Sequence, residues 1–141
     1  MQTRDIMTTP VIAVTPPAAL ADAADVMSRS GFTTLPVVDP TGHLVGLVSE
    51  IDLVEAGFRS RAENTDPDDS ADNATPHTLD TVAMVMHTPG LAVPADLDWA
   101  ELARRMAEAG VRALPVMEHD KLIGMVTFRD VLRAMRVPEE S

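Results

Sequence analysis

The stretch GLVSEIDL, residues 46–53, returns almost unchanged as GMVTFRDV, residues 124–131. Each copy has Gly, two apolar residues, a hydroxyl residue, two free positions, Asp and an apolar residue in the same order. The similarity extends outward from both copies, because IMTTPVIAVTP from Ile6 matches VMHTPGLAVPA from Val85, 79 positions later. The chain of 141 residues is therefore a tandem repeat.

The apolar periodicity predicts the same order of elements in both repeats, β-α-β-β-α. A short strand (VIAV, residues 11–14, in the first repeat) precedes an amphipathic helix that we expect to end at Gly31 or Gly110. Two strands joined by a tight turn follow, and then a helix that begins near Ser49 or Thr127. In the second repeat the apolar face of this last helix should consist of Phe128, Val131, Leu132 and Met135.

These elements predict an α/β fold of two tandem β-α-β-β-α repeats. Neither repeat can cover its own sheet well, so we expect the two to pack about a pseudo-twofold axis. Residues 1–60 should form repeat 1 and residues 81–141 repeat 2. Residues 61–80, which are polar, acidic and contain proline, are predicted to be a flexible linker between them.

The composition argues against several classes of partner. The formal net charge of -11 disfavours nucleic acid, because Lys and Arg must supply the attraction to phosphate. Aromatic residues make up 3% of the chain, too few for a platform that stacks bases. No apolar run approaches the roughly 20 residues of a membrane helix, and the absence of Cys fits a reducing compartment. We expect a cytoplasmic protein that binds neither nucleic acid nor membrane.

Catalysis and metal binding find little support in the sequence. There is no Cys nucleophile, no Ser-His-Asp spacing and no paired buried carboxylate for acid–base chemistry. The four histidines form no close pair with metal-ligand spacing, so we interpret them as solvated or linker residues. The prediction is a protein that is not an enzyme and has no catalytic residues and no metal site. These histidines are His43, His77, His87 and His119.

The repeated motif has two interpretations. Ser49-x-x-Asp52 and Thr127-x-x-Asp130 fit a capping box at a helix start, where Asn in place of Asp should cost little stability. The same helix start can bind a ligand, because its N–H groups and hydroxyl suit a phosphate and its Asp can accept from two ribose hydroxyls. The glycine three residues before the hydroxyl favours a ligand, since capping does not require it and close approach to the strand would. Both interpretations can hold together.

The order IMTTPVIAV, LPVVD and LVGLVSEIDL, written twice with a linker between, resembles a CBS-domain pair, the tandem named for cystathionine beta-synthase. The resemblance covers nearly the whole chain outside the linker. It implies a stand-alone regulatory module that binds an adenosine-containing ligand, either AMP, ADP, ATP or S-adenosylmethionine, in clefts between the repeats. It also implies that the protein forms a homodimer, requires no cofactor and acts on a protein target that the sequence does not identify.

The resemblance further implies which residues contact the ligand. In each cleft one repeat gives the hydroxyl and Asp, and the other gives strand residues that contact adenine. Arg112 offers a charged donor to a phosphate in the first cleft, whereas Thr33 offers only a hydroxyl in the second. The residue after the hydroxyl has the opposite effect in the first cleft, because Glu50 there repels a phosphate. In the second cleft Arg129 attracts a phosphate. The two clefts therefore stay unranked. The first comprises Ser49, Asp52, Leu91, Val111 and Arg112, and the second Thr127, Asp130, Ile12, Phe32 and Thr33.

Two functions remain open at this point. One is a regulatory module that senses an adenosine-containing ligand and signals by a conformational change. The alternative is a structural or interaction protein that has the same fold and dimerises but binds no nucleotide. Binding of adenosine compounds distinguishes them.

Overall fold

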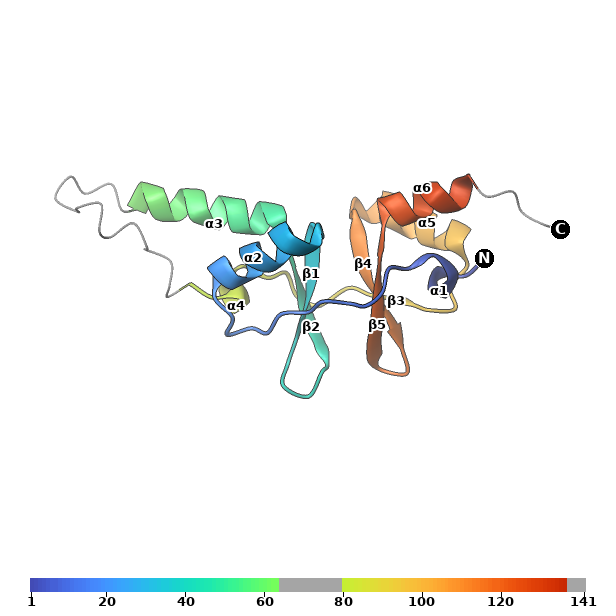
Figure 1. The fold of residues 1–141 in the computed structure, drawn as a ribbon, viewed down its shortest axis with the longest axis horizontal. Coiled ribbons are helices and arrows are strands. Elements are labelled where there is room, and N and C mark those ends of the chain that lie inside the picture. The colour runs from blue at the N-terminus through green and yellow to red at the C-terminus, as the bar shows by residue number, and fades with distance from the viewer. Residues whose placement is uncertain (64–79, 137–141) are drawn as a thin grey trace. The chain divides into compact units, whose positions relative to one another are not determined.

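The computed structural model describes residues 1–63 and 80–136, without the side chains of residues 58–63, and it divides into two compact units (Figure 1). Unit 1 consists of Met1–Ile12 and Leu91–Ser141, and unit 2 of Ala13–Gly90. The units therefore do not coincide with the sequence repeats, because each repeat gives its first residues to the other unit. Most of the predicted linker lies outside the described residues.

Unit 2 is built on an antiparallel hairpin with its helices on one side (Figure 1). The hairpin and the helix that follows it directly confirm the predicted order β-β-α. The first helix of the unit, α2, buries the apolar side chains along one of its faces. It ends at Gly31, which adopts a φ of 78°, as predicted. The elements are α2 (Leu20–Ser30), β1 (Thr34–Val38), β2 (Leu44–Ser49), α3 (Glu50–Glu63) and α4 (Val82–Val85).

The predicted strand at residues 11–14 is reduced to a single bridge. Only Val14 lies beside β1, where its N–H donates to the carbonyl of Pro36 (3.0 Å) and its carbonyl accepts from Val38 (2.9 Å). The physical reason is that the chain passes from unit 1 into unit 2 between Ile12 and Ala13, so the predicted strand is divided between the two units. The prediction of a full strand was wrong.

Unit 1 contains a three-stranded sheet in the order β3-β4-β5, with its helices on one side (Figure 1). β3 is parallel to β4, and β4 and β5 form the predicted antiparallel hairpin. His119 and Asp120 form its turn, with φ of 51° and 65°. The elements are α1 (Thr3–Ile6), β3 (Val93–Pro94), α5 (Trp99–Ala109), β4 (Ala113–Glu118), β5 (Lys121–Thr127) and α6 (Phe128–Met135).

Helix α6 buries a different face from the one that its apolar residues predicted. Val131 is buried, but Leu132 and Met135 are 60% and 63% exposed, and Phe128 is also exposed. The buried face includes Asp130, whose carboxylate turns inward to hydrogen-bonding partners. Three side chains of the predicted apolar face are therefore left at the surface.

The first residues of each repeat pair with the last strand of the unit that they join. In unit 1, Thr8 exchanges two backbone hydrogen bonds with Met125 of β5 (2.7 and 3.1 Å). In unit 2, His87 exchanges two with Leu47 of β2 (2.8 and 3.0 Å). These pairings place the two segments next to the strands that lead into the Ser/Thr-x-x-Asp motifs.

Candidate functional site

The repeated motif forms a capping box at the start of α3 and of α6. In α3, Asp52 Oδ2 accepts from the backbone N–H and the hydroxyl of Ser49 (both 2.8 Å), while Ser49 Oγ accepts from the Asp52 N–H (3.4 Å). In α6, Thr127 and Asp130 make the same three bonds at 2.9, 3.1 and 3.2 Å. The capping interpretation is thereby confirmed in both repeats.

Both aspartates are also buried and have further donors at their carboxylates. Asp52 is 8% exposed, and its Oδ1 lies 2.7 Å from Nε2 of His87. Asp130 is 3% exposed, and it accepts from the Thr8 hydroxyl (3.2 Å to each oxygen) and from Nη2 of Arg133 (3.3 Å). Burial and these added donors exceed what helix capping requires.

His87, Thr8 and Arg133 were missed as partners of the motif. His87 had been interpreted as a solvated or linker residue, and its side chain is indeed 73% exposed, but its hydrogen bond to Asp52 was not predicted. A signal was present, because His87 stands 79 positions after Thr8 and the two segments occupy equivalent places in the two units. The alignment could not show that each segment joins the opposite repeat.

The glycine of the motif is required by the protein chain itself. A Cβ at Gly46 would lie 2.8 Å from the carbonyl oxygen of His87, and a Cβ at Gly124 would lie 2.7 Å from Met7 Sδ and 3.1 Å from the carbonyl oxygen of Thr8. The 2.8 Å and 2.7 Å distances are too short for a Cβ unless a neighbour shifts, and the 3.1 Å distance is tight. The close approach of these incoming segments accounts for the glycines without a ligand, and the ligand interpretation stays a prediction.

Four of the other candidate residues, Phe32, Thr33, Val111 and Arg112, directly precede the two hairpins. In unit 2 the carbonyl of Thr33 accepts from the Glu50 N–H (2.8 Å), and in unit 1 the carbonyl of Arg112 accepts from the Phe128 N–H (2.9 Å). Each unit thus contains the hydroxyl and the Asp of one predicted cleft together with strand residues of the other predicted cleft. Both predicted clefts draw on the two units, so these assignments stay predictions. Unit 2 holds Phe32 and Thr33, and unit 1 holds Ile12, Leu91, Val111 and Arg112.

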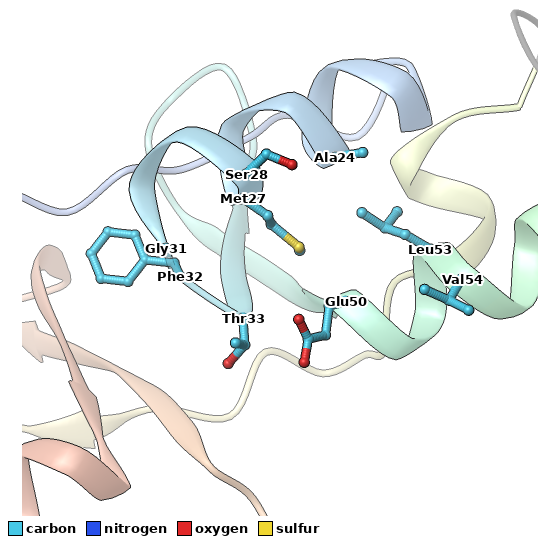
Figure 2. Close-up of a pocket in the computed structure, with 9 residues that line it drawn as sticks. All are labelled: Ala24, Met27, Ser28, Gly31, Phe32, Thr33, Glu50, Leu53 and Val54. Carbon is cyan, nitrogen blue, oxygen red and sulfur yellow. The ribbon is translucent and has the colours of Figure 1, made fainter.

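Unit 2 has a pocket of about 300 Å³ between the end of α2 and the start of α3 (Figure 2). Its walls are mostly apolar, and Figure 2 shows the carboxylate of Glu50 next to Thr33. No lining residue is basic. The lining residues are Ala24, Met27, Ser28, Gly31, Phe32, Thr33, Glu50, Leu53 and Val54.

Residues 1–63 and 80–136 contain neither a candidate membrane span nor a candidate metal cluster. None of the helices there combines the length and the apolar character needed to cross a bilayer. Among the same residues, no three His, Cys, Asp or Glu side chains are grouped so that they could hold a metal ion.

Comparisons with known proteins identify the repeats. CBSX2, solved in complex with AMP, is 28% identical with a TM-score of 0.75 over 95% of each chain. The CBS domain pair of protein MJ0100, solved with 5′-methylthioadenosine and S-adenosyl-L-methionine, shares the fold (22% identity, TM-score 0.76, 96% of this chain and 95% of that chain). The uncharacterized protein MJ1404 of Methanocaldococcus jannaschii is 30% identical over 91% of this chain, which spans 30% of its length.

The sequence model of the CBS domain matches this chain twice, at residues 4–59 and 82–137. The two matches contain both copies of the Ser/Thr-x-x-Asp motif and both hairpins. The order of elements agrees with the predicted tandem fold, apart from the shortened first strand. The chain belongs to the CBS domain family, as a pair of CBS domains.

Proposed function

We propose that this chain is a regulatory module that binds an adenosine-containing ligand with Asp52 and Asp130 and signals to a protein partner by a conformational change. The observation that carries the proposal is the carboxylate of Asp52. Ser49 fixes one of its oxygens, while the other accepts one bond from the residues that the structure describes, donated by an exposed imidazole. A ribose needs such a fixed acceptor for its hydroxyls. CBSX2, solved with AMP, supports an adenosine ligand.

The pocket of unit 2 supports the same ligand class. Adenine is flat and largely apolar, and the walls formed by Met27, Leu53 and Val54 offer apolar contact, with the hydroxyl of Thr33 at the rim. Phe32 and Thr33 are the two residues of this pocket that the family resemblance assigns to adenine. We propose that they contact the base.

Adenosine ligands are expected to raise the melting temperature of the protein. At a free ligand concentration one hundred times the dissociation constant, linkage adds about 2.7 kcal/mol per site to the free energy of unfolding. A thermal-shift series with AMP, ADP, ATP and S-adenosylmethionine at millimolar concentration measures this, with GMP as the control for the base. If no adenosine compound moves the melting curve, the protein is an interaction module without a nucleotide.

The charge of Glu50 should disfavour a phosphate at the pocket of unit 2. Glu50→Gln is expected to tighten AMP binding by up to about fivefold, because an exposed charge interaction is worth up to roughly 1 kcal/mol. Glu55→Gln is the matched control, since Glu55 lies on the same helix but does not line the pocket. Titration calorimetry with AMP compares the two variants. Equal affinities would show that no phosphate lies near Glu50.

We propose that the chain forms a homodimer through the exposed apolar side chains of α3 and α6. Ile51 and Val54 of α3 are exposed, as are Leu132 and Met135 of α6. Apolar side chains at this density on a helix surface favour burial against a second copy. Light scattering on an eluting peak should give twice the chain mass of 15.1 kDa. A mass of one chain at high micromolar concentration would contradict the dimer.

A further inference from the structure

The Asp52 carboxylate has a hydrogen-bonding partner that the Asp130 carboxylate lacks. His87 Nε2 lies 2.7 Å from Asp52 Oδ1, and at the equivalent place in unit 1 the partner is the hydroxyl of Thr8. Because a carboxylate can only accept, Nε2 must carry the hydrogen of this bond. The imidazole is thus a donor placed on the oxygen of Asp52 that Ser49 leaves open.

The number of acceptor positions on Asp52 limits what else it can bind. Each carboxylate oxygen offers about two acceptor positions. Ser49 fills both positions on Oδ2 with its backbone N–H and its hydroxyl, and His87 fills one on Oδ1. Counting donors from the described part of the chain, one position on Asp52 remains. A ribose donates two hydrogen bonds from its adjacent hydroxyls, so it cannot make both while His87 stays in place.

The backbone of His87 is fixed by hydrogen bonds, whereas its side chain is exposed and free to rotate. The backbone makes two hydrogen bonds to Leu47 of β2. The side chain is 73% exposed, and within residues 1–63 and 80–136 its recorded bond is the one to Asp52. Rotation of the imidazole into solvent therefore breaks one hydrogen bond and leaves the fold of the segment intact.

We propose that His87 competes with the ribose for Asp52 and is a specificity-determining residue of this site. An adenosine ligand binds at Asp52 with both ribose hydroxyls only after the imidazole has moved away. The ligand therefore binds more weakly than the carboxylate alone would allow. This inference rests on the proposed function, because it requires that Asp52 accepts from a ribose.

The Asp130 site differs because two side chains share the equivalent role. The Thr8 hydroxyl reaches both carboxylate oxygens, and Arg133 donates to Oδ1. The position of α3 that corresponds to Arg133 is Glu55, which cannot donate as Arg133 does to Asp130. Removing Thr8 alone leaves Arg133 on the Asp130 carboxylate, whereas removing His87 alone frees Oδ1 of Asp52.

Titration calorimetry with adenosine and with 2′,3′-dideoxyadenosine tests this competition. His87→Ala is expected to bind adenosine roughly tenfold more tightly than the parent, because the ribose no longer displaces a hydrogen bond to a charged group. Dideoxyadenosine has no ribose hydroxyls at these positions, so its affinity should not change. Thr8→Ala should change adenosine binding much less. Circular dichroism confirms that each variant is folded, and His87→Thr, which copies the other repeat, serves if His87→Ala is not.

The outcomes separate this inference from the proposed function. If the parent binds adenosine and His87→Ala binds it equally or more weakly, the competition is wrong and the adenosine site stands. If neither the parent nor His87→Ala binds adenosine, the proposed function fails and the inference with it. A gain that extends equally to dideoxyadenosine also overturns the competition, because His87 would then act on some other part of the ligand.

Discussion

Asp130→Asn is expected to lower the free energy of unfolding by roughly 2 to 3 kcal/mol, because a buried acceptor would be replaced by a donor that faces other donors. The side chain of Asp130 is 2% exposed, and its two oxygens accept from Thr127, Thr8 and Arg133. An amide keeps one oxygen, and its NH₂ group must face an N–H or a hydroxyl. Urea unfolding of the parent and the variant measures the difference.

Asp98→Asn is the matched control for this substitution. Asp98 caps α5 with a single hydrogen bond from the Ala100 N–H (3.1 Å) in an exposed position, and Asn caps a helix about as well as Asp. Its stability should therefore hardly change. If Asp130→Asn were equally mild, Asp130 would be a simple helix cap. The sequence alone predicted that Asn at position 130 would cost little stability. The structure predicts a large loss in the free energy of unfolding instead.

Gly46→Ala is expected to destabilise the protein by about 1 to 3 kcal/mol, the usual cost of overpacking. The new Cβ would meet the His87 carbonyl oxygen at 2.8 Å and Met86 Sδ at 3.0 Å. The carbonyl cannot retreat easily, because it accepts from the N–H of Leu47. Thermal unfolding of the variant measures the loss.

Gly57→Ala gives the opposite expectation and serves as the control. Gly57 lies within α3, and a Cβ there meets nothing within 4 Å. Alanine in a helix interior is favoured over glycine by roughly 0.5 to 1 kcal/mol, so this variant should be more stable than the parent. A Gly46→Ala protein as stable as Gly57→Ala would show that the His87 segment does not lie against β2.

Local signals explain what the sequence predicted correctly. The ends of α2 and α5 follow from Gly31 and Gly110, which adopt positive φ, and the capping boxes follow from residues three positions apart. Their chemistry acts between neighbours in the chain, so it is visible in the sequence.

The features that were missed depend on distant residues. The bond between His87 and Asp52 spans 35 positions, and the bond between Thr8 and Asp130 spans 122. The second of these pairings involves the buried face of α6, which includes Asp130 and leaves Leu132 and Met135 exposed. Periodicity within one helix cannot report on a segment that arrives from the other repeat. The pocket of unit 2 was missed as a cavity for the same reason, although Phe32 and Thr33 had been singled out.

Unit 1 is made of two segments that are far apart in the sequence, and this sets the order in which the two units can fold during synthesis. A ribosome has made all of Ala13–Gly90 before it begins Leu91, so unit 2 has all of its residues early. Met1–Ile12 must wait for their partners in unit 1, which lie 94 positions ahead of Thr3 and 122 positions ahead of Thr8, and such distant contacts form late. A fusion or a cut near Thr8 would therefore disturb the hydrogen bonds of Asp130, which lies in the second of the two repeats to be synthesised.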